Sequence, residues 1–403
     1  MEKLSNRRHR TSNIHIPIIM TDSTSISDIN VLSDIVSRSP PNGISVLVVG
    51  SGIGGLTAAR ECLRVGCSVR AFERRPHSVL TGGSFTIGSS ALRSLHNYPR
   101  LQREVKQLGC QPGLMVYKLD GSVISGPLQL TDVLSSSVDR DLASNTLRLS
   151  RPKLYCAMLE HLERMGVHVE YGREVVDYFE NTPAGRAGVI FSDGSRHDAD
   201  IVIAADGVNG HSWKLVLGRE MRAQPSGDAI FRTDFPVRHA ITNPIVAEKF
   251  IGNKQADGQP MVHIYMGDIQ LLAGVYKDTV EWGLVHKDDG RAQESWDRHH
   301  LLERVFELVE KHPDLCEEAK ALISTAPADS IVDWRIMWRD PQPQWTSASG
   351  QVVQLGDAAH TFHPSSGNGA TQAMEDAVSL VTCLSIAGKD DLAWATRVHN
   401  LLR

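Results

Sequence analysis

The sequence lacks the long apolar run that a membrane-spanning helix requires. The closest candidate, Ile14 to Met20, is short and is interrupted by His15 and Pro17. A spanning helix needs about 20 predominantly apolar residues. We therefore expect no stable membrane insertion.

An excess of positive charge is also absent. The 403 residues include 42 Lys and Arg against 47 Asp and Glu, which gives a formal net charge of -5. Proteins that bind nucleic acid usually carry a basic stripe or patch. We therefore expect no nucleic-acid partner.

Cysteines are few and scattered. The six cysteines form no CxxC pair and no secretory signal precedes them, which disfavours a disulfide framework or a zinc site. We expect no bound metal, reduced thiols and a cytoplasmic location. The basic stretch Arg7 to Arg10 is also found in transit peptides, but acidic residues soon follow it, and we expect residues 1–43 to be a flexible tail.

The length exceeds the size at which a single hydrophobic core stops growing, so we expect two domains. Hydrophobic residues make up 41% of the chain and charged residues 22%. Both values are near the averages of globular proteins.

A glycine-rich loop follows the first apolar run. Residues 44–49 predict a strand buried on both faces, residues 56–65 predict a helix, and residues 68–72 predict a second strand. This order is a βαβ unit. Between its first strand and its helix stand three glycines, whose missing side chains let a pyrophosphate approach the backbone and the helix N-terminus: Gly50, Gly52 and Gly55.

Glu73 stands at the end of the second strand of this unit. A carboxylate there can accept hydrogen bonds from the ribose hydroxyls of an adenosine. Glycine-rich turns also occur for structural reasons alone, so the loop indicates a dinucleotide without deciding between NAD and FAD.

A second motif lies far along the chain. Gly356 and Asp357 follow the apolar run 352–355, and Gly367 to Gly369 lead into a predicted helix over 370–380. A NAD-binding domain has no use for a second phosphate and ring site at this distance. The combination therefore favours FAD.

The segments between the motifs have strand patterns. The turn Asp120–Gly121 joins two short apolar segments and predicts a local antiparallel sheet. Alternating segments between residues 225 and 287 predict a second antiparallel sheet. Two helices are expected over 292–311 and 314–324, followed by a loop that leads to residue 352.

Four stretches resemble the class A FAD-dependent monooxygenases, the group of para-hydroxybenzoate hydroxylase, and especially their members in fungal secondary metabolism. The stretches are 48–75, 85–95, 200–207 and 355–380. The resemblance implies an α/β fold in which a Rossmann-type FAD-binding domain carries an inserted antiparallel-sheet substrate domain. We assign residues 44–111, 145–224 and 345–403 to the discontinuous FAD-binding domain, and 112–144 and 225–344 to the substrate domain.

The resemblance also implies roles for single residues. Asp357 would hold the ribitol and pyrophosphate of FAD. Asp206 would lie near FAD and near the path by which NADPH approaches it. The alternative is that Asp206 only ends a strand in an Asp–Gly turn. Arg151 matches an FAD-contacting arginine at a helix start, although Ser150 replaces the usual preceding histidine. The alternative for Arg151 is a solvated helix end.

The glycines of the second motif would contact the flavin ring. Gly367, Asn368, Gly369 and Ala370 would bring backbone amides beside the pyrimidine edge, where a helix N-terminus stabilises negative charge on the ring. Thr371 stands where relatives often have asparagine, which changes or removes one side-chain contact. We interpret the histidines of this region, His360 and His363, as structural.

The expected reaction uses NADPH, bound transiently, to reduce FAD, and O2 then supplies one oxygen atom to an electron-rich small molecule. We expect hydroxylation of a phenolic or polyketide-derived secondary metabolite. Arg232 and Tyr265 resemble a pair that holds a phenolate in some fungal dearomatising hydroxylases; the alternative for both is packing within the sheet.

Four other hypotheses stay open at this point. The protein could be an epoxidase of a polyene polyketide or a Baeyer–Villiger enzyme, since fold does not fix function. The end of the sequence within a predicted helix, 392–403, also suggests a flavin-binding protein without productive turnover. A nicotinamide-dependent dehydrogenase would leave Asp357 unexplained.

Overall fold

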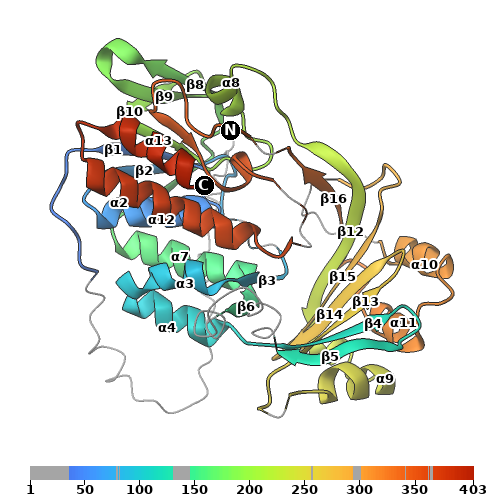
Figure 1. Cartoon of the computed structure of the whole chain (residues 1–403). Coiled ribbons are helices and arrows are strands. Elements are labelled where there is room, and N and C mark those ends of the chain that lie inside the picture. The colour runs from blue at the N-terminus through green and yellow to red at the C-terminus, as the bar shows by residue number, and fades with distance from the viewer. Residues whose placement is uncertain are drawn as a thin grey trace, which may run out of the picture. The chain divides into compact units, whose positions relative to one another are not determined.

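The fold is described from a computed structural model of the chain (Figure 1). The described residues are 36–403, apart from 79, 81, 130–145, 256, 294–300, 341, 362, 364 and 365. Most of the expected tail, residues 1–35, and part of the first substrate-domain segment lie outside the described residues.

A five-stranded parallel sheet carries the first glycine loop. Its strand order is β17-β11-β1-β2-β7, and every pair in it is parallel. Helix α2 (Ile53–Arg64) connects β1 to β2, which confirms the expected βαβ unit. The strands are β1 (Ser45–Val49), β2 (Ser68–Glu73), β7 (Val169–Tyr171), β11 (Ile201–Ala204) and β17 (Val352–Gln354).

Both faces of this sheet are buried, which explains the unbroken apolar run of β1. Val46 and Val48 belong to one core, and Leu47 and Val49 to another. The first core includes residues of α2, α7 (Arg151–Arg164) and α12 (Gly369–Ala387), which run side by side in Figure 1. The second core lies against a three-stranded antiparallel sheet of β8 (Val175–Asn181), β9 (Arg186–Phe191) and β10 (Arg196–Ala199).

The backbone ahead of β1 is held against the end of α2. The N–H of Ser39 donates to the carbonyl of Arg64 (2.8 Å), and the N–H of Asn42 donates to the carbonyl of Gly66 (3.0 Å). This part of the expected flexible tail, 1–43, is therefore bonded to the folded body, because its N–H groups satisfy carbonyls that a helix end leaves free.

Several shorter elements connect the larger ones. Strands β3 (Ser84–Ile87) and β6 (Leu147–Ser150) form an antiparallel pair. The other helices of this part of the chain are α3 (Ser89–Arg93), α4 (Pro99–Leu108), α8 (Trp213–Leu217) and α13 (Leu392–Leu402), with 3-10 helices η1 (Ser94–Asn97), η2 (Thr182–Ala184) and η5 (Gly356–Ala358).

A seven-stranded sheet has the order β16-β12-β15-β14-β13-β4-β5. Two separate antiparallel sheets were expected here, but the parallel pair β4–β13 joins them into one. The other pairs are antiparallel. The division into two domains at the expected boundaries stays a prediction. The strands are β4 (Gly113–Lys118), β5 (Val123–Gln129), β12 (Gln224–Pro236), β13 (Met261–Met266), β14 (Gln270–Tyr276), β15 (Thr279–Lys287) and β16 (Val332–Trp338).

Helices cover one face of this sheet and leave the other to a cavity. Tyr265 and Leu271 pack into a hydrophobic core with the helices, whereas Ile264 and Leu272 line the cavity on the opposite face. This alternation follows from the pleat of a strand. The covering elements are α9 (Pro244–Val246), α10 (Leu302–Glu310) and α11 (Glu317–Ser324), together with the 3-10 helix η3 (Val237–His239) and the π-helical turn η4 (Ala247–Gly252).

Two elements differ from expectation. Of the helix expected over 292–311, the structure describes α10 (Leu302–Glu310), residues 294–300 lie outside the described residues, and Gln293 forms a β-bridge with Trp334. Strand β16 lies where a loop was expected. Apolar and charged residues alternate from Val332 to Ile336, and the two charged ones, Asp333 and Arg335, form ion pairs with charged residues outside the strand.

Candidate active site

Of two adjoining cavities, the first lies at the carboxyl ends of β1, β11 and β17, where ligands bind in parallel α/β sheets. The first, of about 430 Å³, is lined by the glycine loop, by Asp357 and by residues of β12. The second, of about 550 Å³, is lined mainly by the seven-stranded sheet. The two share part of their wall: Ser84, Phe85, Ile230, Arg232, His363, Ser366, Gly369 and Ala370.

The glycines of the first loop are required for two different reasons. A Cβ on Gly50, whose φ is +96°, would overlap the carbonyl of Ala205, and a Cβ on Gly55 would overlap the carbonyl of Gly50. Gly52 has no atom within 4 Å of its Cβ position and lines the first cavity. Gly50 and Gly55 therefore permit close backbone packing, and Gly52 keeps the cavity open.

Glu73 organises the same loop from the end of β2. Its carboxylate accepts hydrogen bonds from the Ser51 backbone N–H (3.1 Å), the Ser51 hydroxyl (3.0 Å) and the Arg75 N–H (3.1 Å). It also lines a small third cavity of about 30 Å³ together with Gly52 and Arg151. Glu73 thus lies where the sequence places it, beside the glycine loop.

Arg151 and Asp357 lie on the wall of the first cavity. The Asp357 carboxylate faces the cavity, and burial among protein atoms raises its pKa above the ordinary value, an effect that His360 and Arg151 oppose. Burial also lowers the pKa of Arg151, with nearby Arg75 acting in the same direction. The structure therefore brings together these two opposite charges from segments far apart in the sequence.

Asp206 does not line either cavity. Its carboxylate accepts hydrogen bonds from the Tyr178 hydroxyl (2.7 Å) and the His211 N–H (3.1 Å), and burial raises its pKa. The flanking Ala205 and Gly207 line the first cavity instead. The Asp–Gly turn after β11 therefore puts the neighbours of Asp206 on the cavity wall, and the role of Asp206 toward FAD and NADPH stays a prediction.

The second glycine motif lies where both cavities meet. Gly367 to Ala370 line the second cavity, and α12 begins at Gly369 with no side-chain hydrogen bond at its N-cap, Asn368. Thr371 does not contact this space with its hydroxyl, which instead accepts a hydrogen bond from the Gly88 N–H (2.9 Å). The start of α12 therefore borders the cavity and has no side-chain cap.

The two histidines of this region differ. His360 lies 2.6 Å from Asp376 and is held within the folded body, in agreement with a structural role. His363 lines both cavities and lies 4.0 Å from Asp228.

The structure does not bring Arg232 and Tyr265 together. Arg232 lines both cavities. Tyr265 is fully buried on the other face of the sheet, where its ring stacks on Tyr117 at 4.9 Å. The pair expected from the resemblance therefore needs correction: Tyr265 follows Ile264, which lines the cavity, and the strand pleat turns it to the helix side.

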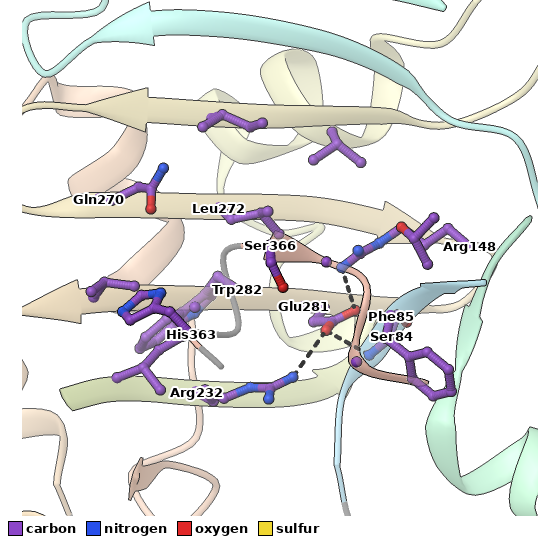
Figure 2. A pocket seen from close by; sticks show the side chains of 18 of the residues that line it. Ser84, Phe85, Arg148, Arg232, Gln270, Leu272, Glu281, Trp282, His363 and Ser366 are labelled. Carbon is purple, nitrogen blue, oxygen red and sulfur yellow. Dashed lines mark hydrogen bonds and ion pairs between the residues drawn. The ribbon is translucent and has the colours of Figure 1, made fainter. Parts of the chain in front are cut away.

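Two further charged residues of the second cavity were missed from the sequence. Figure 2 shows Glu281 between Arg148 and Arg232, with distances of 3.6 Å and 3.9 Å to their guanidinium groups. The Ser84 N–H donates to the same carboxylate at 2.7 Å. A lone acidic residue in the apolar segment 280–285 was the available signal for Glu281.

The rest of the second cavity is largely apolar. Its walls come from six strands of the seven-stranded sheet and include Leu114, Ile230, Val262, Ile264, Leu272, Val285 and Ile336. Such a cavity suits a small organic molecule with few polar groups.

The residues present fit an FAD molecule. Gly52, Gly207 and Gly367 line the cavities and have no atom within 4 Å of a Cβ position, so the wall is open at these three points. Helices α2 and α12 both begin at this wall, and neither has an acidic residue in its first turn. Uncapped helix N-termini favour a phosphate group and an electron-rich ring.

The parallel sheet, the two glycine motifs and the apolar cavity define an FAD-dependent oxidoreductase. A family model described as "FAD binding domain" matches residues 43–391, and the chain belongs to this family. FAD-dependent monooxygenase fsr3 of Gibberella fujikuroi is 40% identical over 371 residues, which cover 91% of this chain and 70% of fsr3. FAD-dependent monooxygenase dmxR9 of Cryptosporiopsis sp. is 37% identical over 380 residues, which cover 92% of this chain and 72% of dmxR9. The expected class of flavoprotein monooxygenase is confirmed.

Solved structures agree with this assignment. CtdE in complex with FAD and substrate 4 has a TM-score of 0.78 and 27% identity, covering 89% of this chain and 85% of CtdE. A salicylate hydroxylase substrate complex has a TM-score of 0.68 and 20% identity, covering 91% and 85%, and shows the same fold. Within the described part of the chain, no helix is long and apolar enough to cross a membrane, and no group of three or more His, Cys, Asp or Glu could hold a metal.

Proposed function

We propose that this protein uses NAD(P)H and O2 to insert one oxygen atom into a small phenolic or polyketide-derived substrate bound in the second cavity. The observation that supports this best is the lining of that cavity, which is apolar over most of its wall and carries two arginines beside the second glycine motif. An apolar wall excludes water from the reacting groups.

The cofactor contacts are part of this proposal. Glu73 would bind the adenosine ribose, Gly50 to Gly55 and the N-terminus of α2 the pyrophosphate, and Asp357 with Arg151 the centre of the cofactor. Gly367 to Ala370 would bind the ring through their backbone. When bound, FAD accepts a hydride from NAD(P)H and activates O2.

The charges of the second cavity favour hydroxylation of a phenol over epoxidation. Arg232 would bind the substrate oxygen and stabilise its ionised form, which makes the ring a better nucleophile. An isolated carbon–carbon double bond has no group for such a cation. The named relatives are described only as FAD-dependent monooxygenases, so this preference depends on Arg232.

Product analysis tests the proposal. The purified chain carrying FAD is incubated with NADPH, isotopically labelled O2 and a panel of phenolic and polyene polyketides. We expect bleaching of the flavin by NADPH and phenolic products that contain one labelled oxygen atom. Epoxides from polyenes alone would favour the epoxidase, and hydrogen peroxide without any oxygenated product would favour a flavoprotein without productive turnover.

We also propose a cytoplasmic location. All six cysteines are free, which is typical of a reducing compartment. Fractionation of cells that express the full gene, with immunodetection of the protein, tests this.

A further inference from the structure

Asp376 of α12 is a fully buried carboxylate and is not among the described residues that line the three cavities. Its oxygen Oδ2 accepts a hydrogen bond from the Gly356 N–H (3.0 Å) and lies 2.6 Å from His360 Nε2. The other oxygen, Oδ1, accepts a hydrogen bond from Arg403 Nε (2.7 Å). Gly356 and His360 flank Asp357, which lines the first cavity. One oxygen atom of Asp376 therefore closes the turn that carries Asp357.

Two side chains from the segment after β16 hold the carbonyl groups of the same turn. Arg339 Nη1 donates to the Ala358 carbonyl at 2.6 Å. Gln342 Nε2 donates to the Ala359 carbonyl at 2.8 Å. No hydrogen bond to the Asp357 side chain is found among the described residues, and only nearby charges act on it besides burial. The backbone of the turn therefore sets where this carboxylate lies.

Helix α12 connects this turn to the second glycine motif. The helix begins at Gly369, which lines both cavities, and Asp376 follows about two helical turns later. The turn and the helix are closely packed, because a Cβ on Gly356 would lie 3.1 Å from the Cβ of Ala373. The same helix thus borders the second cavity with its start and holds the turn of the first cavity with Asp376.

We propose that Asp376 is a positioning residue for FAD, which fixes Asp357 at the first cavity through Gly356 and His360. This inference rests on the proposed function, in which Asp357 contacts the cofactor. Burial alone would raise the pKa of Asp376, but the hydrogen bond from His360 and the charge of Arg403 hold it below the ordinary value. The carboxylate is therefore ionised at neutral pH, and both of its oxygens accept hydrogen bonds.

The test measures the Kd of FAD by titration of the FAD-free protein, followed in the flavin absorption spectrum, without NADPH. Asp376→Leu should raise the Kd on the order of tenfold, because buried donors of the turn lose their acceptor. Asp376→Asn removes the same charge but can keep an oxygen toward Gly356, so it should recover part of the affinity. Loss of a negative charge would by itself favour an anionic cofactor. Weaker binding of FAD therefore reports position and not charge.

A double-mutant cycle tests whether Asp376 acts through Asp357. In Asp357→Asn protein, Asp376→Leu should raise the Kd much less than in the unsubstituted protein, because the contact that it positions is already lost. In Glu73→Gln protein, Asp376→Leu should keep its full effect, because Glu73 belongs to the proposed adenosine end of the site. A residue with only a structural role would weaken FAD binding equally in both.

Asp200→Leu is the matched control. Asp200 is also a buried carboxylate, and it accepts a hydrogen bond from the Ser45 N–H (2.7 Å). It lies at the amino ends of β1 and β11, whereas the first cavity lies at their carboxyl ends. Asp200→Leu should lower the urea midpoint but leave the Kd of FAD within about twofold, because distant sites act independently.

A second pair of variants applies if Asp376→Leu does not fold. His360→Gln keeps a donor toward Asp376, whereas His360→Leu does not. His360→Leu should therefore raise the Kd of FAD more than His360→Gln does, and equal effects of the two would overturn the inference.

The inference is also overturned if Asp376→Leu leaves the Kd within about twofold, if Asp200→Leu raises it equally, or if Asp376→Leu has the same effect in Asp357→Asn and Glu73→Gln proteins. An unchanged Kd in Asp357→Asn alone would overturn both the proposed cofactor contact and this inference. Because the titration involves no turnover, failure to find an oxygenated product would affect the proposed function and leave this result standing.

Discussion

Gly50, Gly52 and Gly55 stand in one loop, yet they lack side chains for different reasons. At Gly50 and Gly55 an added Cβ would overlap backbone carbonyl oxygens, whereas at Gly52 it would enter the cavity. The same spacing motif therefore combines a requirement of folding with a requirement of binding. Substitutions can separate the two.

Gly55→Ala should lower the free energy of unfolding of the FAD-free protein by about 1–3 kcal/mol, the usual cost of overpacking. Gly52→Ala should leave that stability within about 0.5 kcal/mol, since the φ of Gly52 is -64° and suits alanine, but should weaken FAD binding on the order of tenfold. Urea unfolding and FAD titration measure the two effects. Equal loss of stability in both variants would contradict this distinction.

Arg232 and Tyr265 make a second contrast at the residue scale. Arg232→Met should raise the KM for a phenolic substrate on the order of tenfold, because a buried charge contact is lost. Tyr265→Phe should change KM and kcat less than about twofold, because Tyr265 lies on the helix-covered face. Steady-state kinetics with a substrate found by product analysis measure both, and a large effect of Tyr265→Phe would contradict the sheet geometry.

At the scale of elements, the seven-stranded sheet has two faces with different tasks. Strand β13 turns Val262 and Ile264 to the cavity, and His263 and Tyr265 to the helices. His263 is fully buried and lies 3.2 Å from the Tyr117 hydroxyl. The helix-covered face therefore carries a histidine whose protonation opposes folding.

Burial lowers the pKa of His263 from 6.5 to about 4, and Lys249 adds to the effect. Between these values the unfolded chain binds a proton that the folded chain does not. The contribution of His263 to stability is thus fully present above pH 6.5 and is lost as the pH falls toward 4. We expect the midpoint of urea unfolding to fall as the pH falls over this range. In His263→Phe the midpoint should change less steeply with pH.

The pH dependence of the urea midpoint is the quantity to compare, since His263→Phe also removes the hydrogen bond to Tyr117 and can lower stability at every pH. His168→Gln changes an exposed histidine and should leave the slope unchanged. If the slope of His263→Phe equals that of the unsubstituted protein, the buried histidine does not set the acid sensitivity.

At the scale of the whole molecule, the cavities belong to neither sheet alone. The first cavity combines the glycine loop after β1 with Arg232 of β12, and the second combines six strands of the seven-stranded sheet with the start of α12. A cofactor bound there contacts elements from most of the chain. Its binding should therefore stabilise the whole fold.

FAD should raise the free energy of unfolding by about 2.7 kcal/mol when free FAD is 100 times its Kd, because only the folded chain binds it. Thermal unfolding with and without FAD measures the shift. Riboflavin, which lacks the adenosine and the pyrophosphate, should give a much smaller shift if Glu73 and the glycine loop bind that end. An equal shift with riboflavin would contradict the role of the loop.

The sequence alone determined the parts of this protein that depend on short segments. The strand–loop–helix–strand unit from β1 to β2, the strand before Gly356 and the helix after Gly369 were all predictable, because alternation, apolar runs and glycines act within a few residues. Together with the family resemblance, these segments identified the cofactor and the class of reaction.

Only the tertiary structure decided which side chains meet. The sequence could not show that β4 pairs in parallel with β13, that the pleat turns Tyr265 away from Arg232, or that Asp206 binds Tyr178. It also could not place Glu281 between Arg148 and Arg232, which come from three different strands. Contacts between distant segments depend on register and face, and a one-residue change in register exchanges the two faces of a strand.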